Sequence, residues 1–361
     1  MKIGVLGAGA IGSFFGGLLA RHYGPENVIL VGRGAHAEKV RSRGYLLLSS
    51  KGRIHKIPVR FELAPDALKD AELVLFCVKS HATAEALRQA HPYLKNATVI
   101  AIQNGICDYL FTEWIPQERL LAATTSINVA LVAPGEVTLQ LDGITMLGPM
   151  FSQATDAARK AKSVLLQAGL RISFTPEIHG VRYTKLGINA VGYVSCLSAS
   201  NFISEGLLYP DWRRQVAIPL LKEILDVYRA AAIKPRPIPG RSSLTGLARI
   251  CHTLDIPCIG GFVGWVLRQF FNRRPIIFSL YQDLLAGKKT EVEFIHGEIV
   301  RLAKQSACRA PLNELVIDLV HELESQPSAT FFSREEIIDR FSTATGTAKP
   351  VSVTPRKESR Q

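Results

Sequence analysis

Short apolar runs alternate with helical patterns over the first hundred residues of the chain. The runs are four to seven residues long and almost free of polar side chains, at 2–7, 28–31, 72–78 and 97–103. Helical patterns follow the first run up to about residue 22 and the third run from about 82 to 94. Because helices cover a parallel sheet on both faces, its strands appear in the sequence as continuous apolar runs. The pattern therefore predicts a doubly wound parallel sheet with helices between its strands.

Weaker strand patterns complete this first domain. Residues 45–48 and 55–61 flank the polar turn 49–52, which is typical of a hairpin. The further elements expected here are strands at 120–129 and 137–147 around Pro134-Gly135, a helix at 153–168 and a strand at 171–174. We expect the first domain to cover residues 1–175.

The chain after residue 175 carries almost no strand pattern. Long amphipathic stretches predict helices at 178–200, 205–233, 279–306 and 311–324. A second, all-helical domain is therefore expected at 176–330, interrupted at 234–274 by a segment rich in Pro, Gly and Arg. Residues 342–361 are rich in Ser, Thr, Pro and Lys, a composition typical of a disordered tail.

The net charge of the 361 residues is +12, but the excess is concentrated in two segments. Residues 234–274 carry seven Lys or Arg against the single acid Asp255, and the tail carries four against Glu358. Hydrophobic residues at 47% and charged residues at 20% are ordinary for a globular protein and exclude global disorder. No basic stripe interleaved with aromatic residues accompanies the charge, so nucleic acid is not an expected partner.

Cysteine spacing and hydrophobic length exclude several classes of protein. The six cysteines contain no C-x-x-C pair, which argues against a zinc site, a redox dithiol or a disulfide framework, and no metal is expected. The longest uncharged apolar segment, 256–267, has twelve residues, fewer than the roughly 18 that a spanning helix takes. Glycines interrupt the apolar start of the chain, unlike a secretory leader. We expect a cytoplasmic protein with reduced thiols.

A glycine-rich turn joins the first strand to the first helix. Its glycines have the spacing G-x-G-x-x-G, which permits a tight turn and a close backbone approach to a pyrophosphate. An ordinary turn is the alternative, but the strand before, the helix after and the second strand favour a dinucleotide site. The expected cofactor-binding residues of this turn are Gly7, Ala8, Gly9, Ala10, Ile11 and Gly12. The fold class predicted is α/β, with an N-terminal Rossmann-type doubly wound sheet followed by an all-helical C-terminal domain.

The residues after the second strand distinguish between the two nicotinamide cofactors. An NAD site usually has an acidic side chain there, which accepts hydrogen bonds from the ribose 2′-hydroxyl. This chain has Gly32-Arg33-Gly34 instead. The guanidinium of Arg33 can pair with a 2′-phosphate and stack on adenine, so NADP is expected rather than NAD. A solvated loop arginine is the alternative.

Two further loops follow predicted strands of the sheet, where ligands bind in open α/β folds. Lys79 lies in the first, Val78-Lys79-Ser80, and Asn104 in the second, Gln103-Asn104-Gly105. A surface lysine and a simple turn are the alternatives. Their positions favour a contribution to the ligand site.

In the helical domain, Lys185 and Asn189 lie four residues apart and therefore share one helix face. A desolvated lysine there can act as a proton donor. A snorkelling lysine beside a satisfied core asparagine fits the composition equally well. Glu291, further along the chain, would by itself be most simply a solvated helix charge.

Taken in order, these motifs resemble the ketopantoate reductase (2-dehydropantoate 2-reductase) family over about residues 1–325. The matching segments are GAGAIG at 7–12, Arg33, V-K-S at 78–80, Q-N-G at 103–105, K-L-x-x-N at 185–189, S-x-x-Q-D from 279 and T-E-x-E from 290. The resemblance implies an NADPH-dependent oxidoreductase that reduces a small branched 2-keto acid. The substrate it implies is 2-dehydropantoate, reduced to (R)-pantoate in pantothenate and coenzyme A biosynthesis.

The same resemblance assigns roles to matching residues. Lys185 corresponds to the catalytic lysine that gives a proton to the substrate carbonyl oxygen. Asn189, Ser279 and Glu291 correspond to substrate-binding residues. Asn104 corresponds to the asparagine that links the cofactor and substrate sites, and Lys79 to a cofactor-side lysine.

The chain also departs from the family pattern. Glu293 and His296 stand where the family typically has Asp and Asn, and Tyr193 stands where some members have a second asparagine. These changes leave the identity of the 2-keto acid open. The alternatives are a related NADP-dependent 2-keto acid or opine-type dehydrogenase, or a non-catalytic NADP-binding protein attached to a membrane or partner through 234–274.

The segment 234–274 is longer and more basic than the resemblance leads one to expect. It contains a mostly apolar stretch, 256–271, with Phe262 and Trp265, bordered by arginines. Three interpretations stay open: folding against its own domain, a protein contact within a homodimer, or a peripheral membrane contact. We expect the segment to be accessory, so that the active site does not depend on it.

Overall fold

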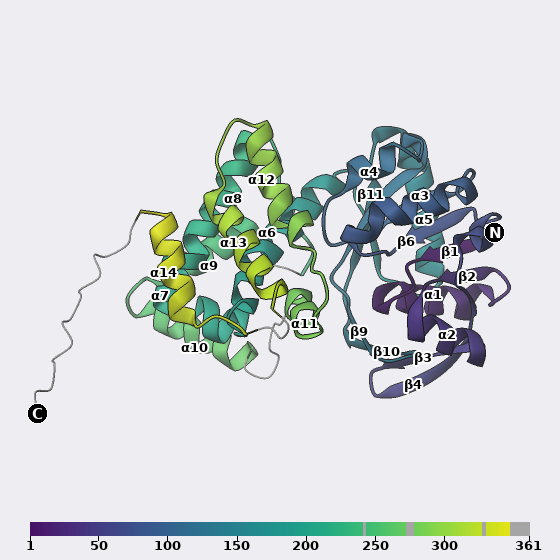
Figure 1. Cartoon of the computed structure of the whole chain (residues 1–361), viewed down its shortest axis with the longest axis horizontal. Coiled ribbons are helices and arrows are strands. Elements are labelled where there is room, and N and C mark those ends of the chain that lie inside the picture. The colour runs from purple at the N-terminus through teal and green to yellow at the C-terminus, as the bar shows by residue number, and fades with distance from the viewer. Residues whose placement is uncertain (241–242, 272–277, 327–329, 347–361) are drawn as a thin grey trace, which may run out of the picture.

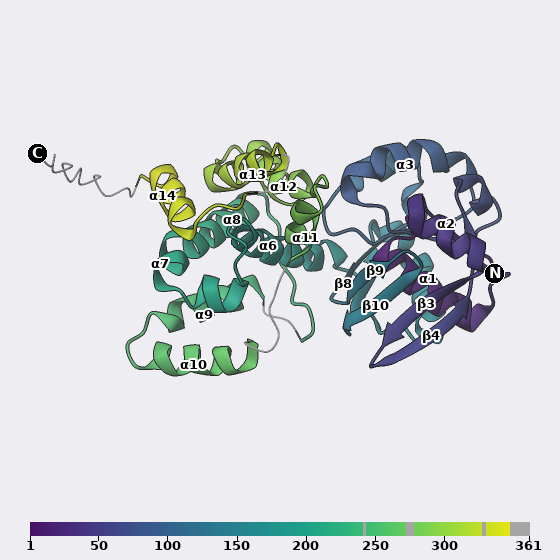
Figure 2. The ribbon, with the colours of Figure 1, turned by 60° about the horizontal axis from the view of Figure 1, so that its bottom comes forward.

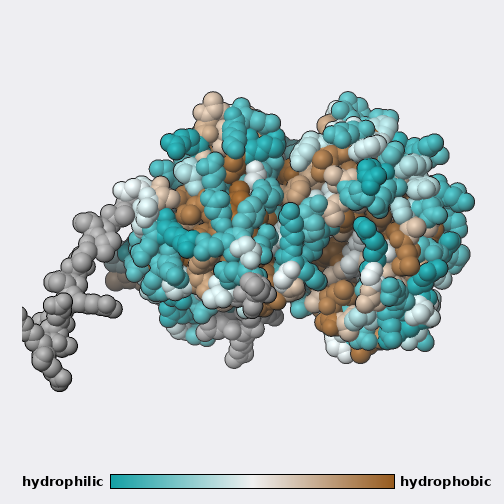
Figure 3. Space-filling view, viewed as in Figure 1, coloured by the Kyte–Doolittle hydropathy of each residue, from teal (hydrophilic) through white to brown (hydrophobic). Residues whose placement is uncertain are grey.

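The computed structural model describes residues 1–240, 243–271, 278–326 and 330–346. The chain folds into a sheet-containing N-terminal half and a helical C-terminal half, which lie side by side (Figure 1). Hydrophilic residues cover most of the face seen in Figure 3, and apolar side chains gather where the two halves meet. The predicted fold class is confirmed.

Eight strands form the main sheet, in the order β12-β11-β8-β7-β6-β1-β2-β5. Their bounds are β1 (Ile3–Leu6), β2 (Val28–Val31), β5 (Arg60–Glu62), β6 (Leu73–Phe76), β7 (Thr98–Ala101), β8 (Leu120–Thr125), β11 (Thr145–Pro149) and β12 (Ile172–Phe174). All neighbours are parallel except β8 and β11. Every residue of β1, β2 and β6 is buried, which explains why these strands appear as continuous apolar runs.

Helices cover both faces of this sheet. Their bounds are α1 (Ala10–Tyr23), α2 (Gly34–Arg43), α3 (Thr83–Ala90), α4 (Asp108–Thr112) and α5 (Thr155–Gln167). Phe15 of α1 and Leu165 of α5 belong to the core on one face, and Leu87 of α3 and Phe111 of α4 to the core on the other. The N-terminal half is therefore the doubly wound arrangement that the sequence predicts.

A second sheet of four strands stands apart from the main one and was not predicted (Figure 2). Its order is β4 (Arg53–Pro58), β3 (Tyr45–Ser50), β10 (Glu136–Leu141), β9 (Asn128–Ala133). The stretches predicted as single strands at 120–129 and 137–147 each divide, with one part in each sheet. The two stretches lie close together at Ser126 and Gly143, where a Cβ on Gly143 would lie 2.7 Å from the Ser126 carbonyl carbon. They therefore leave the main sheet side by side.

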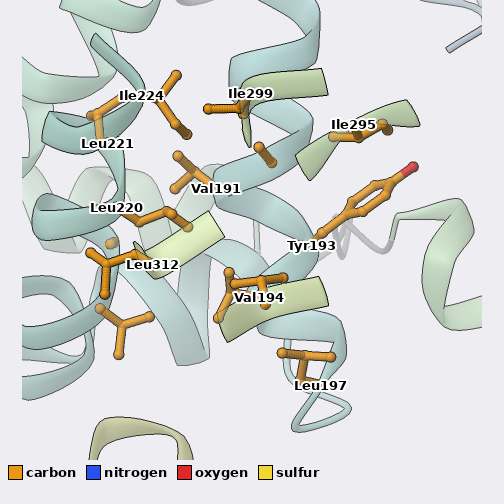
Figure 4. Close-up of a cluster of buried hydrophobic side chains, with 14 of the residues drawn as sticks. Val191, Tyr193, Val194, Leu197, Leu220, Leu221, Ile224, Ile295, Ile299 and Leu312 are labelled. Carbon is orange, nitrogen blue, oxygen red and sulfur yellow. The ribbon is translucent and has the colours of Figure 1, made fainter. Parts of the chain in front are cut away.

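The helical half is built around α6 (Ile178–Cys196). Figure 4 shows Val191 and Val194 of this helix among aliphatic side chains of the neighbouring helices. The other helices are α7 (Pro210–Trp212), α8 (Ile218–Ala230), α9 (Leu244–Leu254), α10 (Ile259–Phe271), α11 (Ser279–Leu285), α12 (His296–Gln305), α13 (Pro311–Glu324) and α14 (Arg334–Ala344). The helix predicted at 205–233 is broken before Pro210, and the one predicted at 279–306 is broken between α11 and α12.

The helical half continues beyond residue 330, which corrects the predicted end of the domain. Ser333 and Glu336 form a reciprocal capping box at the start of α14, and Phe341 is fully buried. The prediction of a disordered tail from residue 342 is therefore wrong for 342–344, which belong to this helix. Residues 347–361 lie outside the described part of the chain.

The segment 234–274 contributes α9 and α10. Leu244 of α9 is buried against α6, where a Cβ on Gly187 would lie 2.9 Å from its methyl groups. α9 thus folds against its own domain, which is one of the three interpretations above, and the expectation that the active site does not depend on this segment stays a prediction. Residues 241–242 and 272–274 of the segment lie outside the described part of the chain.

Candidate functional site

The chain from the end of β1 into the first turn of α1 requires glycine at two of the three positions Gly7, Gly9 and Gly12. Gly7 has φ +88°, and a Cβ there would lie 2.5 Å from the Val78 amide nitrogen. A Cβ on Gly12 would lie 2.5 Å from the Gly7 carbonyl oxygen. Nothing lies within 4 Å of a Cβ on Gly9. Gly7 and Gly12 are thus demanded by the fold, whereas the open side of Gly9 is room that a ligand can use.

A cavity of about 300 Å³ lies at this loop. Five predicted cofactor residues line it: Gly7, Ala8, Gly9, Arg33 and Lys79. Ala10, Ile11 and Gly12 instead form the first turn of α1, whose amides begin the helix beside the cavity. The described lining has two cationic side chains and no carboxylate. The positive charge of Arg33 and Lys79 and the open glycine loop, which we call the glycine cradle, fit the phosphates of a dinucleotide.

His36 stabilises the glycine loop through hydrogen bonds, a role that the sequence does not indicate. Its Nδ1 accepts a hydrogen bond from the Gly135 amide at 2.9 Å, so the ring proton is on Nε2. Nε2 lies 2.9 Å from the Ser13 hydroxyl, which donates to the Ala8 carbonyl oxygen at 3.0 Å. Burial lowers the pKa of His36 and keeps the ring neutral. The neutral ring therefore connects the glycine loop to the second sheet.

Lys185 and Asn104 meet where the two halves of the molecule join. The Lys185 Nζ donates to the Asn104 Oδ1 at 2.8 Å and to the Thr125 carbonyl oxygen at 2.9 Å. Asn189 lies one turn further along α6 and is partly buried. The structure therefore brings the predicted proton donor against the loop at the end of β7.

Ser279 and Glu291 lie near the same junction. The Tyr193 hydroxyl and Ser279 Oγ are 3.3 Å apart, and the Ser80 amide donates to the Glu291 Oε1 at 2.8 Å. Burial raises the pKa of Tyr193, and the nearby charge of Glu291 raises it further, so the phenol is neutral. Figure 4 shows its hydroxyl pointing away from the aliphatic cluster. Tyr193 is thus a polar group of this region whose role the sequence did not reveal.

Lys79 makes an ion pair across the junction. Its Nζ lies 2.5 Å from Oδ1 of Asp283, a residue of α11. The lysine side chain is 45% exposed and also lines the cofactor cavity. Asp283 belongs to the S-x-x-Q-D motif, which is the only sequence signal for its role.

Arg182 and Asp108 form a second, more deeply buried ion pair between the halves. The Arg182 Nη1 donates to both carboxylate oxygens at 2.7 Å, and the two side chains are 3% and 14% exposed. Arg182 precedes Lys185 by three residues on α6, and its Nη2 lies 3.4 Å from the Gly105 carbonyl oxygen. The pair therefore fixes α6 relative to the loop that carries Asn104. The sequence signal for this pair is the charged residue Arg182 within a largely apolar helical stretch.

Among the residues that the structure describes, no group of three or more His, Cys, Asp or Glu side chains is arranged to hold a metal ion. No helix in the described part of the chain is long and apolar enough to cross a membrane. What the described site offers is an anion-binding cradle beside a junction that carries a lysine ammonium, two amides, hydroxyls and a carboxylate. These groups suit reduction of a polar carbonyl compound by a bound dinucleotide.

Two family models cover most of the chain. "Ketopantoate reductase PanE/ApbA" matches residues 3–151, and "Ketopantoate reductase PanE/ApbA C terminal" matches residues 177–324. The chain belongs to the ketopantoate reductase family. It is therefore an oxidoreductase with a dinucleotide-binding N-terminal half, as the sequence predicts.

Curated relatives and solved structures agree with this family. The chain is 30% identical to a 2-dehydropantoate 2-reductase of Pyrococcus horikoshii, over 90% of this chain and 98% of the relative. It is 26% identical to one of Halobacterium salinarum, over 89% and 98%. A ketopantoate reductase structure from Ralstonia eutropha superposes with a TM-score of 0.71 at 25% identity, over 90% and 98%. The fold is also that of D-mandelate dehydrogenase with NADH and anilino(oxo)acetate, with a TM-score of 0.73 at 22% identity over the same shares.

Proposed function

We propose that this chain catalyses the NADPH-dependent reduction of 2-dehydropantoate to (R)-pantoate, in pantothenate and coenzyme A biosynthesis. The observation that carries the proposal is the contact of Lys185 with Asn104, at the junction beside the glycine cradle. The curated relatives named 2-dehydropantoate 2-reductase, which match nearly their whole length, support the same substrate. The reaction belongs to the cytoplasm, where the six free cysteines stay reduced.

The proposed mechanism uses few protein groups. When bound, NADPH supplies the hydride that reduces the carbonyl carbon. The Lys185 ammonium donates a proton to the carbonyl oxygen and stabilises its developing negative charge. Asn104 and the Thr125 carbonyl hold the lysine at the junction, as their 2.8 and 2.9 Å contacts indicate.

Substrate binding is assigned to residues of α6, α11 and the segment before α12. Asn189 follows Lys185 by one turn, so its amide can bind the substrate carboxylate or hydroxyl. The Ser279 hydroxyl and the Glu291 carboxylate offer further hydrogen bonds. Glu291 also accepts the Ser80 amide, which ties substrate binding to the loop that carries Lys79.

Preference for NADPH rests on the charge of the cavity. Arg33 is exposed at the end of β2 and lines the cavity, and no described lining residue is acidic. A guanidinium there pairs with a 2′-phosphate, whereas a ribose 2′-hydroxyl gains little from it. Arg33→Asp should therefore weaken NADPH binding far more than NADH binding. The matched control is Arg41→Asp, on the exposed side of α2, the helix that begins directly after Arg33. Equal losses of NADPH and NADH binding in Arg33→Asp would contradict the assignment.

The competing function is reduction of a different 2-keto acid. The structural likeness to D-mandelate dehydrogenase favours an aromatic 2-keto acid as the second candidate, and Tyr193, near Ser279, stands where some family members have a second asparagine. NADPH oxidation with 2-dehydropantoate, 2-ketoisovalerate, pyruvate and phenylglyoxylate separates these functions. A higher kcat/KM for phenylglyoxylate than for 2-dehydropantoate would overturn the proposed substrate.

The role of Lys185 has its own test. Lys185→Ala should lower kcat by about 10²–10⁴-fold, because a positioned proton donor contributes that much. NADPH affinity, measured by fluorescence titration, should change little, since Lys185 is not among the residues lining the cofactor cavity. Lys160→Ala, on the exposed face of α5, is the control. Near-normal turnover of Lys185→Ala would remove the lysine from the mechanism.

A further inference from the structure

Helix α10 presents an apolar face that the described part of the chain leaves uncovered. The exposed residues and their exposed fractions are Ile256 46%, Ile259 51%, Phe262 67%, Trp265 58% and Val266 39%. The first four follow one another at three-residue intervals and Val266 lies four residues after Phe262, so those within the helix share one side of it. The rings of Phe262 and Trp265 stack on this surface with centroids 6.3 Å apart. We call these five residues the α10 face.

The opposite side of α10 is packed against its own domain. Gly260 is buried, and a Cβ there would lie 2.3 Å from the Leu254 carbonyl oxygen. A Cβ on Gly264 would lie 3.7 Å from methyl groups of Leu208 and Leu254. The glycines therefore seat the helix closely on its neighbours. Figure 2 shows α10 on the outside of the helical half, beyond α9 and away from the sheets.

The segment of chain that carries the α10 face is basic. No acidic residue occurs between Ile256 and Phe271, and Arg268 is exposed in the last turn of α10. Asp255 is already engaged by Arg213 at 2.5 Å and Arg214 at 3.0 Å. Arg249 of α9, the helix that packs against α10, is also exposed. A partner of this surface must therefore accept apolar aromatic groups and supply negative charge.

We propose that the α10 face binds the surface of an anionic lipid bilayer. Phenylalanine, tryptophan and isoleucine side chains partition into the headgroup and acyl boundary, while neighbouring arginines bind lipid phosphates. The 13 residues of α10 are too few to span a bilayer, which takes about 20, so the helix lies along the surface. The reductase would thus be held at a membrane by one element of its helical half.

A second copy of the chain fits this surface less well. A two-fold contact brings the same patch of both copies together, so Arg268 and its basic surroundings would face their own equivalents. Stable interfaces also bury about 800 Å² per partner from roughly 20–30 residues, whereas the α10 face has five apolar side chains. Insertion into a lipid interface requires only one apolar helix face.

Vesicle co-sedimentation of the full chain tests the proposal. The protein should pellet with vesicles of phosphatidylcholine and phosphatidylglycerol in equal parts, and less at high salt or with phosphatidylcholine alone. The double variant Phe262→Ser/Trp265→Ser should bind more than about tenfold more weakly, since two large apolar groups leave the interface. Ile54→Ser/Val132→Ser, which removes two similarly exposed residues of the second sheet, should bind like the unchanged protein.

Folding and self-association are checked in the same variants. Because Phe262 and Trp265 lie outside the site, the double variant should keep its circular dichroism and its NADPH-dependent turnover. Failure of the unchanged protein to sediment with anionic vesicles, or equal binding by both double variants, would overturn the proposal. So would light scattering that shows a dimer of the unchanged protein and a monomer of Phe262→Ser/Trp265→Ser, because the face would then be a contact between copies.

Discussion

The buried pair of Arg182 and Asp108 should be worth more to this protein than any exposed ion pair. Asp108→Asn keeps the shape of the side chain but removes its charge, which leaves a guanidinium that is 3% exposed without its carboxylate. The Gly105 carbonyl oxygen, 3.4 Å away, is too distant to compensate. Breaking a buried pair by removing one charge costs about 3–5 kcal/mol. Because the new amide still accepts a hydrogen bond, we expect a loss of about 3 kcal/mol in the free energy of unfolding.

The matched control is Asp156→Asn on α5. Asp156 is 88% exposed and pairs with Arg159 at 3.1 Å, so its loss should cost about 0–1 kcal/mol. Urea unfolding, followed by circular dichroism and tryptophan fluorescence, measures both losses. The effect at Asp108 should persist at high salt, because a buried pair is screened much less than an exposed one.

The same substitution should also lower turnover. Arg182 holds α6 against the loop of Asn104, and Lys185 lies three residues further along that helix. A shift of the lysine relative to Asn104 would impair proton transfer, so kcat should fall more than NADPH affinity. If Asp108→Asn costs less than about 1 kcal/mol and leaves kcat unchanged, the pair neither stabilises the junction nor positions the lysine.

Two further predictions concern the cofactor loop and a buried histidine. Gly9→Ala should weaken NADPH binding but leave the midpoint of urea unfolding unchanged, because its Cβ meets only open space. Gly12→Ala should also lower that midpoint, since its Cβ would lie 2.5 Å from the Gly7 carbonyl oxygen. Equal stability of the two variants would contradict these different roles. Burial lowers the pKa of His296 to about 4, so between about pH 6.5 and 4 the unfolded chain binds a proton that the folded chain does not. The free energy of unfolding should therefore fall by about 1.4 kcal/mol per pH unit on acidification through this range. His296→Asn, which retains a donor for Asn313, should flatten this dependence in urea unfolding, and an unchanged slope would show that another group is responsible.

Local patterns determined much of this protein in advance. The alternation of apolar runs and helices predicted the doubly wound sheet, because strands buried on both faces must be apolar throughout. The spacing of Gly7, Gly9 and Gly12 predicted the glycine loop, because the fold excludes larger side chains at Gly7 and Gly12 and leaves open space at Gly9. The spacing of Ser333 and Glu336 is also typical of a capping box, and it marks the residue before the start of α14.

Contacts between distant segments were decided only by the tertiary structure. The second sheet pairs β3 with β10, about ninety residues apart, and periodicity reports which face is buried but not which strand is the neighbour. His36 with Gly135, Asp108 with Arg182 and Lys79 with Asp283 are likewise far apart in the chain. Each side chain alone is compatible with a solvated surface position. Burial, where an unpaired charge or donor is costly, makes the contacts of His36 and Asp108 specific, and the pairs of Asp108 with Arg182 and Lys79 with Asp283 join the two halves.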